Sequence, residues 1–463
     1  MGGAAVAALL GGYGCKQVIG WEEPVLMGEE ADAGVDAGEG GSGGSGGAGG
    51  SGGTGGSGGM GGCTAAKDCP GGLNAAGTCE AGVCGLMCET GFGDCDGMPG
   101  CETSTVDNKE ACGACGTTCA AYCKGTGCND PVYVGNGFHH YCAILKDGSL
   151  HCWGRNEDGE LGDGSVVSKT QPVKVALPKP ALQVEGGLTQ TCAVLTDGTV
   201  ACWGVANKTP MVVQGLKNIK EVATGSGYAC AVDLAGTLFC WGNNVYGQLG
   251  TGDTSFGIVP VQIMSGVLQV SAGDKHTCAV KAGGTLQCWG YNNQGQLGIG
   301  STTNQHSPTN VAGLSGVVEV RCGANHTCAR HAGAISCWGN DNQDQLGTTP
   351  GSDNTKPQLV SLFDVQSVAL GINHTGAIAA GGVFMWGPNE VGQLGNGTKT
   401  GSGKPIAAAV LDSVTPSMLV LGSSSSCMLA QMGAIYCWGG NVYGQLGNGT
   451  TTSSLTPTPV IWP

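Results

Sequence analysis

The sequence predicts an all-β fold built from seven repeats over the region that begins at about residue 130. The first observation is a three-residue phrase, Cys-Trp-Gly or once Met-Trp-Gly, that occurs seven times. Its tryptophans are separated by 50, 38, 48, 49, 48 and 52 residues, a period typical of propeller blades or other stacked repeats. The second observation is an alternating apolar run, broken by a glycine turn, that precedes most of the phrases and indicates a β-hairpin.

In six repeats another cysteine precedes the phrase, and the spacing predicts that the two cysteines face each other across the hairpin. Cys192 and Cys202 are opposed if Thr196–Gly198 forms a three-residue loop whose last residue is left-handed, a conformation that glycine favours. Glycine stands at that position in the five repeats with ten-residue spacing. Where the spacing is nine, a two-residue loop, Ala332–Gly333, restores the opposition. Opposed side chains of a hairpin lie close enough for a disulfide.

The sixth repeat supports this pairing because it lacks both cysteines together: Gly376 and Met385 stand in their places. The prediction is therefore six disulfides, each closing a short loop and adding roughly 2–3 kcal/mol of stability. Reduced core cysteines are the alternative. Cys322 is left over and is expected to be a buried thiol. The six expected pairs are Cys142–Cys152, Cys192–Cys202, Cys230–Cys240, Cys278–Cys288, Cys328–Cys337 and Cys427–Cys437.

One large ring at a fixed place in each repeat indicates a packing residue between neighbouring units. An indole buries about 200 Å², so this explanation is preferred to a cofactor or chromophore role. The expected inter-blade residues are Trp153, Trp203, Trp241, Trp289, Trp338, Trp386 and Trp438.

The fourth repeat shows the whole pattern. His-Thr-Cys-Ala-Val at His276–Val280 is followed by Cys-Trp-Gly-x-Asn-x-x-Gly-Gln-Leu-Gly at Cys288–Gly298. This pattern resembles the repeat of the regulator-of-chromosome-condensation propellers. The resemblance implies a seven-bladed β-propeller of four-stranded blades over residues 129–463. The second repeat is at least ten residues short and lacks the Gly-Gln-Leu-Gly loop, so its blade is expected to be trimmed. The terminal segment 458–461 is expected to complete the blade begun by residues 132–134 and so to close the ring.

Residues 1–14 form a signal-like segment, since the apolar run at 4–14 is too short to span a bilayer but suits the core of an export signal. Cys15 follows small residues and precedes a polar stretch, which resembles a bacterial lipoprotein cleavage site. The expectation is lipidation of Cys15 and export to the outer membrane or cell surface. Plain secretion and a cytoplasmic chain are the alternatives.

Residues 15–62, which include an almost pure Gly/Ser stretch, cannot bury a core and are expected to form a flexible, disordered tether. Residues 63–128 hold twelve cysteines and few large apolar residues, which predicts a small disulfide-rich module of unknown connectivity. Zinc at Cys112 and Cys115 is the less favoured alternative. The module resembles the stigma-specific-type cysteine-rich repeats of extracellular proteins. Its cysteines are Cys63, Cys69, Cys79, Cys84, Cys88, Cys95, Cys101, Cys112, Cys115, Cys119, Cys123 and Cys128.

The formal charge of −15 is concentrated in the N-terminal region. Residues 1–129 hold 4 Lys and Arg against 15 Asp and Glu, whereas residues 130–463 hold 15 against 19, a difference of −4. A nearly neutral propeller offers no basic footprint for nucleic acid. The chain also lacks the basic tail of the eukaryotic namesake, so neither chromatin nor a small GTPase is expected as a partner.

No catalytic constellation stands out, and neither a cofactor nor a metal is expected. Four histidines share one repeat position, but equivalent positions of different blades lie on a ring. A repeated hydrogen bond is therefore favoured over a metal site. Carboxylate pairs such as Glu157 with Asp158 and Asp341 with Asp344 fall in loops, where solvated charge is the default. The histidines are His140, His276, His326 and His374.

The resulting hypothesis is an exported binding module, not an enzyme, that recognises a protein or glycan through one propeller face. It touches a membrane only through the lipid anchor. A passive structural component of the envelope or matrix is the first alternative, and a surface hydrolase is the second.

Overall fold

The computed structural model describes residues 127–348, 354–409 and 414–463, together with short strands between residues 75 and 124. In the N-terminal part, β1 (Ala75–Glu80) pairs with β2 (Val83–Cys88), β3 (Phe92–Gly93) with β4 (Thr103–Ser104), and β5 (Cys123–Lys124) with β6 (Gly127–Cys128). Cys128 is disulfide-bonded. The signal-like segment, Cys15, the tether and the other cysteine side chains of the module lie outside the described residues. No helix in the described part of the chain is long and apolar enough to cross a membrane.

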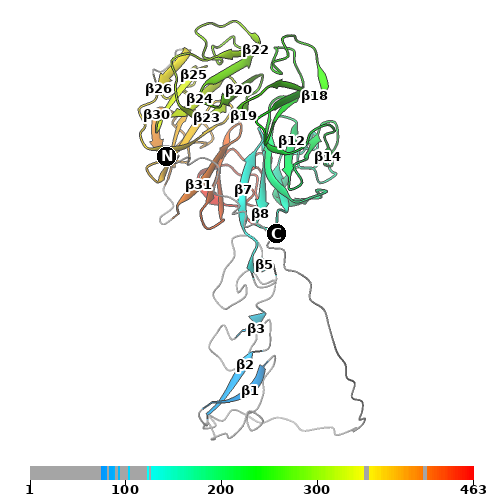
Figure 1. The fold of residues 1–463 in the computed structure, drawn as a ribbon. Coiled ribbons are helices and arrows are strands. Elements are labelled where there is room, and N and C mark those ends of the chain that lie inside the picture. The colour runs from blue at the N-terminus through cyan, green and yellow to red at the C-terminus, as the bar shows by residue number, and fades with distance from the viewer. Residues whose placement is uncertain are drawn as a thin grey trace, which may run out of the picture. The chain divides into compact units, whose positions relative to one another are not determined.

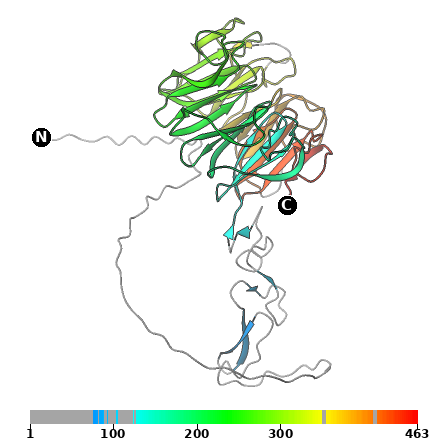
Figure 2. The ribbon, with the colours of Figure 1, turned by 90° about the vertical axis from the view of Figure 1, so that its right-hand side faces the viewer.

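Seven four-stranded antiparallel sheets form a β-propeller (Figures 1 and 2). In each blade the strands run in chain order from the first, which lines the central axis, to the fourth at the rim. The strands of blades 1 to 3 are β7 (Pro131–Asn136), β8 (His140–Leu145), β9 (Leu150–Gly154) and β10 (Lys169–Val175); β11 (Ala181–Gly186), β12 (Gln190–Leu195), β13 (Val200–Gly204) and β14 (Met211–Val212); and β15 (Ile219–Thr224), β16 (Tyr228–Asp233), β17 (Leu238–Gly242) and β18 (Gly257–Met264).

Blades 4 to 7 follow the same order. Their strands are β19 (Val267–Ala272), β20 (His276–Lys281), β21 (Leu286–Gly290) and β22 (Gln305–Asn310); β23 (Val317–Cys322), β24 (His326–His331), β25 (Ala334–Gly339) and β26 (Asn354–Leu359); β27 (Val365–Leu370), β28 (Thr375–Ala379), β29 (Gly382–Gly387) and β30 (Ser402–Ala407); and β31 (Pro416–Leu421), β32 (Ser425–Ala430), β33 (Ile435–Gly439) and β34 (Ser454–Pro459).

The expected closure by a shared blade is wrong. The terminal strand β34 is the fourth strand of the blade that starts with β31, whereas β7 is the first strand of blade 1. The chain thus enters the propeller on an innermost strand and leaves it on an outermost one, so that every blade is one contiguous segment. Blades 7 and 1 meet through their faces, with β31 beside β7 (Figure 1).

The second and third strands of each blade form the hairpins that the glycine turns predict. In the five hairpins with three-residue loops, the last loop residue is a glycine with φ between 74° and 87°. In blade 5 both residues of the two-residue loop have positive φ, 48° for Ala332 and 76° for Gly333. This places Cys328 opposite Cys337, as Cys192 stands opposite Cys202.

Six disulfides join the cysteines that face each other across these hairpins, in the same pairs that the register predicts. All but one of the paired side chains are buried, and Cys202 is partly buried in the trimmed blade. In blade 6, Gly376 stands opposite Met385. A Cβ added to Gly376 would meet the Met385 sulfur at 2.6 Å, so the long methionine fills the space that a cysteine pair occupies elsewhere.

Blade 2 is trimmed as the short repeat implies. Its outer strand β14 has two residues, both exposed, and no Gly-Gln-Leu-Gly loop precedes it. Because this loop is missing, Trp241 of the next blade is only partly buried. The other six indoles are no more than 3% exposed. Each of those six therefore belongs to the core between its own blade and the preceding one.

Candidate binding face

Two kinds of connection lie on the same side of the propeller. They are the turns between the first and second strands and the long loops between the third and fourth strands; we call this side the loop face. Because successive strands are antiparallel, the hairpin tips and the connections between blades lie on the opposite side. The loop face holds the polar motifs that recur in the repeats, so the structure shows which of these side chains are structural and which are available to a ligand.

In most long loops an asparagine and a glutamine side chain form hydrogen bonds within the loop itself. Asn292 Oδ1 accepts from the Leu297 amide at 2.9 Å, and its Nδ2 donates to the carbonyls of Ser301 and Thr303 at 2.9 Å each. Gln296 Oε1 accepts from the Gln294 amide at 3.0 Å. In four other long loops a leucine amide likewise donates to Oδ1 of the loop asparagine. These bonds hold the loops in one conformation, although Nε2 of Gln248 in the loop of blade 3 is buried without a partner.

The shared histidines link neighbouring blades. His276 Nε2 contacts Thr327 Oγ1 of the next blade at 2.9 Å, Thr327 donates to the Gln296 carbonyl at 2.8 Å, and Trp338 Nε1 donates to that same carbonyl at 3.0 Å. His140, His326 and His374 make the equivalent contact at 2.8–3.0 Å. Burial lowers the pKa of His276 to about 3, so this histidine stays neutral. The repeated hydrogen bond favoured from sequence is present.

In the three blades without a histidine at this position, another residue contacts the neighbouring blade. Blade 7 has the small Ser425 at this position, and its hydroxyl lies 2.9 Å from the hydroxyl of the large Tyr141 of blade 1. Blade 3 has Tyr228, whose hydroxyl donates to the His276 carbonyl at 2.6 Å. In blade 2, Gln190 donates to the Tyr228 carbonyl at 2.7 Å. The three interfaces without this histidine thus each have a different pair of residues.

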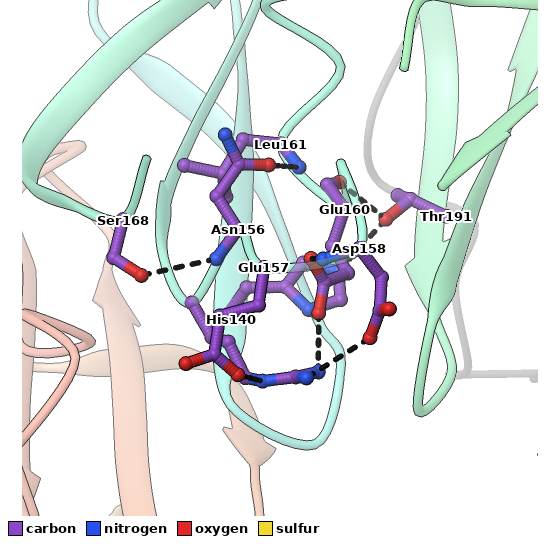
Figure 3. A network of polar contacts seen from close by, with 9 residues as sticks. His140, Asn156, Glu157, Asp158, Glu160, Leu161, Ser168 and Thr191 are labelled. Carbon is purple, nitrogen blue, oxygen red and sulfur yellow. Dashed lines mark hydrogen bonds and ion pairs between the residues drawn. The ribbon is translucent and has the colours of Figure 1, made fainter. Parts of the chain in front are cut away.

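The first long loop differs from the others because a glutamate replaces the glutamine (Figure 3). Glu160 is fully buried and accepts from Arg155 Nη1 at 2.5 Å and from the Asp158 amide at 2.8 Å. Arg155 also pairs with Glu157 at 2.8 Å and with the Asp158 carboxylate at 2.9 Å. The carboxylate pair Glu157 and Asp158 therefore neutralises a guanidinium and is not arranged for acid–base catalysis. The other pair is also structural, since Asp341 accepts from the Leu346 amide at 3.0 Å.

An aromatic patch stands free of these networks on the loop face. The rings of Tyr246 and Tyr291 lie 4.6 Å apart, and Lys275 Nζ is 5.7 and 6.0 Å from their centroids. Asp274 holds the same ammonium at 3.1 Å, and Val245 beside Tyr246 is 64% exposed. Three elements contribute: the loops of blades 3 and 4 and the turn before β20. We call these five residues the tyrosine patch.

A second pair of the same kind lies on the same face at blades 7 and 1. Tyr443 lies 5.5 Å from the ring of His139, and Val442 is 70% exposed. One tyrosine of each pair, Tyr246 or Tyr443, lies in the sequence Asn-Val-Tyr-Gly-Gln-Leu-Gly, which occurs only in repeats three and seven. Sequence analysis missed them, although the repeated Val-Tyr at the variable loop positions was a signal that could have been used.

The axis of the ring holds a polar cavity of about 120 Å³, lined by the first strands of all seven blades. Charged groups reach it from three of these strands: Glu185, Glu221 and Arg321. Glu185 accepts from the Tyr133 hydroxyl at 3.0 Å. Asp274 is the member of the tyrosine patch that also lines the cavity.

Glu221 occupies a position that is glutamine in the neighbouring blades. Gln183 accepts from the Val222 amide at 2.8 Å and donates to the Val222 carbonyl at 3.2 Å, and Gln269 bonds Val320 in the same way. Glu221 accepts from the Val270 amide. Burial raises the pKa of Glu221 to about 8, although Arg321 and Lys220 act against the increase. A neutral carboxyl is the form that can imitate glutamine here.

Within the described ranges, one group of three potential metal ligands lies close together. The ligand atoms of His276, Cys278 and Cys322 are within 4.8 Å of one another. Cys278 is bonded to Cys288, so its thiolate is not available in the oxidised chain. Cys322 is the free cysteine among the described residues, and burial raises the pKa of its thiol to about 12. The four equivalent histidines do not form a common ligand set there.

Two family models match the propeller. The model of the RCC1-like domain matches residues 129–377, and the model of the Regulator of chromosome condensation (RCC1) repeat matches residues 380–429 and 432–463. A segment of 57 residues is 40% identical to the E3 ubiquitin-protein ligase MYCBP2 of Danio rerio. That segment covers 12% of this chain and 1% of that protein.

Solved structures share the architecture. Human WBSCR16 superimposes with a TM-score of 0.62 and 23% identity, over 68% of this chain and 94% of that one. Prp20p from Saccharomyces cerevisiae, described with its binding properties to Gsp1p and histones, gives a TM-score of 0.58 and 22% identity over 63% of this chain and 80% of its own. At these identities the likeness shows the fold alone.

Proposed function

Because this chain belongs to the regulator of chromosome condensation (RCC1) family, whose propeller is a protein-interaction fold, we propose that it is a recognition module without enzymatic activity. It binds a protein or a glycan through the loop face. The tyrosine patch carries the proposal, since Tyr246, Tyr291 and Lys275 present rings and a cation that no scaffold bond requires.

Tyrosines held on rigid loops lose little conformational entropy on binding, and aromatic residues dominate the energy of many interfaces. The Asn and Gln bonds of the long loops fix Tyr246 and its neighbours before a ligand arrives. Val245, 64% exposed, extends the patch with an apolar contact. A preorganised patch of this kind suits saturable recognition.

The partner that we propose is neither nucleic acid nor a small GTPase. Residues 130–463 hold 15 basic against 19 acidic side chains, which gives no basic face for phosphates. At 22% sequence identity, the likeness to Prp20p shows a shared fold only, so the partners of Prp20p are not assigned to this chain.

Export and a lipid anchor are part of the proposal. The apolar run at residues 4–14 and the placement of Cys15 support it, and so do six disulfides in the propeller, a type of bond that persists in oxidising compartments. Replacement of Cys15 by serine is expected to release the mature protein from membranes. If the Cys15→Ser protein stays as firmly membrane-bound as the wild type, the anchor is wrong.

The test of recognition compares two variants of the full oxidised chain. Both are immobilised and exposed to envelope extract and to a glycan array at physiological salt. Tyr246→Ala with Tyr291→Ala is expected to weaken a saturable ligand by a factor of ten or more, as loss of about 1.4 kcal/mol implies. Leu234→Ala, at an exposed hairpin tip on the opposite side, is the control and should bind like wild type.

Equal binding by both variants would exclude the tyrosine patch as the recognition surface. The absence of any saturable ligand for a folded, oxidised chain would favour a structural role. Turnover of a bound glycan, lost on replacement of one carboxylate, would instead establish a hydrolase.

A further inference from the structure

The junction of blades 4 and 5 holds a group of sulfur and nitrogen atoms that has no counterpart elsewhere in the described part of the chain. Cys322, at the end of β23 in blade 5, packs against the Cys278–Cys288 disulfide of blade 4. A ring nitrogen of His276 and the sulfurs of Cys278 and Cys322 lie within 4.8 Å of one another. Cys288 is directly opposite Cys278 in the hairpin and is bonded to it, so its sulfur adjoins this group of three.

We propose that the reduced form of this cluster is a metal site. Cys278, Cys288, Cys322 and His276 supply three thiolates and one imidazole, the Cys₃His set that suits a tetrahedral Zn²⁺ ion. Soft thiolate ligands also favour other thiophilic ions of this class over Mg²⁺ or Ca²⁺.

The chemistry is a balanced exchange between a disulfide and a metal. A dithiol reductant gives two electrons and two protons to the Cys278–Cys288 bond and is itself oxidised to a disulfide. The two new thiols and the Cys322 thiol then lose their protons as the ion binds. When a disulfide oxidant takes two electrons from the Cys278 and Cys288 thiolates and is itself reduced to a dithiol, the bond between them forms again, the ion is released and the Cys322 thiolate takes up a proton. In a chain that is synthesised reduced, the metal would hold blades 4 and 5 together before the disulfide forms.

The burial of the cluster supports a closed site. Cys278, Cys288 and His276 are all 0% exposed, and Cys322 borders the axial cavity, which gives an ion a route of entry. Nδ1 of His276 is buried and makes no hydrogen bond. The Cys322 sulfur makes a 3.6 Å contact to the Ser271 carbonyl and also interacts with Thr327 and with the backbone of Cys278, so it lies directly beside the hairpin that carries the other ligands.

The other blades provide matched controls. In blade 5, His326 and the Cys328–Cys337 disulfide repeat the arrangement, but Leu370 occupies the position equivalent to Cys322. A metal site should therefore be absent there. The ring also tolerates a blade without its disulfide, since blade 6 has Gly376 and Met385.

The first experiment opens one disulfide at a time in the oxidised full chain, without a reductant, so that the other disulfides remain closed. Cys288→Ala leaves the Cys278 and Cys322 thiols beside His276, and Cys337→Ala leaves Cys328 beside His326. Under anaerobic conditions each protein is titrated with Co²⁺. The Cys288→Ala protein is expected to bind one equivalent with the intense visible bands of tetrahedral thiolate coordination and to release it to Zn²⁺. The Cys337→Ala protein is expected to show none.

Two further variants separate coordination from folding. Cys288→Ala with Cys322→Ala should lose the bands while it retains the β-sheet circular dichroism of its parent. Replacement of His276 by glutamine, the residue that blade 2 has at this position, should weaken binding by more than the ~10–100-fold typical of losing an outer-sphere partner.

The wild-type chain tests the four-ligand form. After full reduction, it should hold one more equivalent of Zn²⁺ than the Cys322→Ala variant reduced in the same way. Equal metal content would overturn the proposal. So would a Cys288→Ala protein without tetrahedral Co²⁺ bands, or peptide mapping that finds Cys278 joined to Cys322 even under anaerobic conditions.

Discussion

At the scale of residues, the structure shows substitutions that are compensated by a neighbour. The first long loop replaces the usual glutamine by Glu160 and adds Arg155 to neutralise it. The sequence showed the near-match to Gly-Gln-Leu-Gly but not the compensation, because Arg155 and Glu160 are brought together only by the closed loop. Solvated charge was the expectation for Glu157 and Asp158, and both instead pair with Arg155.

Removal of Arg155 alone should therefore be costly. Arg155→Ala leaves a fully buried carboxylate unpaired and is expected to lower the free energy of unfolding by about 2 kcal/mol, measured by denaturant titration. The double variant Arg155→Ala with Glu160→Gln restores the glutamine of the other loops and should lie within about 1 kcal/mol of wild type. A double variant as unstable as the single one would contradict the pairing.

Glu221 gives a prediction with a defined pH dependence. Its pKa is raised from 4.5 to about 8, so the folded chain keeps a proton that the unfolded chain loses above pH 4.5. The stability that this proton provides is complete below pH 4.5 and is lost as the pH rises through 8. Arg321, Lys220 and Glu185 are the charged groups that act on it. Glu221→Gln, which copies Gln183 and Gln269, should stabilise the chain by about 1 kcal/mol at pH 9 and change little at pH 5. An equal effect at both values would show that Glu221 is not protonated.

At the scale of elements, the hairpins were the most predictable part of the molecule. Loop length, the left-handed glycine and the two-residue period determine which side chains face each other, and the paired loss at Gly376 and Met385 is a sequence-level sign of that contact. The tyrosine patch was not predictable in the same way. Tyr246, Tyr291 and Lys275 belong to three different connections, and only packing of blade 3 against blade 4 brings them together.

Blade 6 can accept the disulfide that it lacks. Gly376→Cys with Met385→Cys places two cysteines at opposed positions and removes the methionine that a new Cβ would strike. The Leu419 side chain, whose Cδ2 would lie 2.8 Å from the same Cβ, must also shift. The bond should form on oxidation and raise the free energy of unfolding by about 2–3 kcal/mol, relative to the same protein reduced selectively or to Met385→Cys alone. Gly376→Cys alone should destabilise, since its Cβ would lie 2.6 Å from the Met385 sulfur. Failure of the double variant to form the bond would show that the register differs in this blade.

At the scale of the whole molecule, the number of blades followed from the resemblance and the repeat count, but the mode of closure did not. The spacing of the tryptophans gives the number of repeats, but it does not show which strand is the first of a blade. The ends of the chain suggested a shared sheet. The structure instead closes the ring with side chains: Tyr141 meets Ser425, and Trp153 donates to the Gln445 carbonyl at 3.0 Å.

Closure should then depend on Tyr141. The Tyr141 hydroxyl contacts Ser425 and accepts from the Gly422 amide at 3.1 Å, so Tyr141→Phe is expected to cost about 1–2 kcal/mol. Hydrogen exchange should rise selectively in β7 and β31. Tyr228→Phe, the matched change between blades 3 and 4, should leave those two strands protected. Uniform exchange in both variants would argue against a local opening between blades 7 and 1.

The side-chain pairs at the junctions between blades differ, and this difference has a consequence for how such a ring can evolve. A ring of contiguous, nearly identical cassettes can gain or lose one by duplication or deletion, and nothing in a uniform set of contacts would tell the chain where to stop. Here a serine meets a tyrosine at one junction, a tyrosine and a glutamine distinguish two others, and histidine with threonine or serine serves the remaining four. These pairs make three of the junctions between blades different from the rest. An eighth cassette copied from blade 4 and inserted after blade 7 would present a histidine to Tyr141, which is matched to the small Ser425, so the junction that closes the ring selects the blade that precedes it.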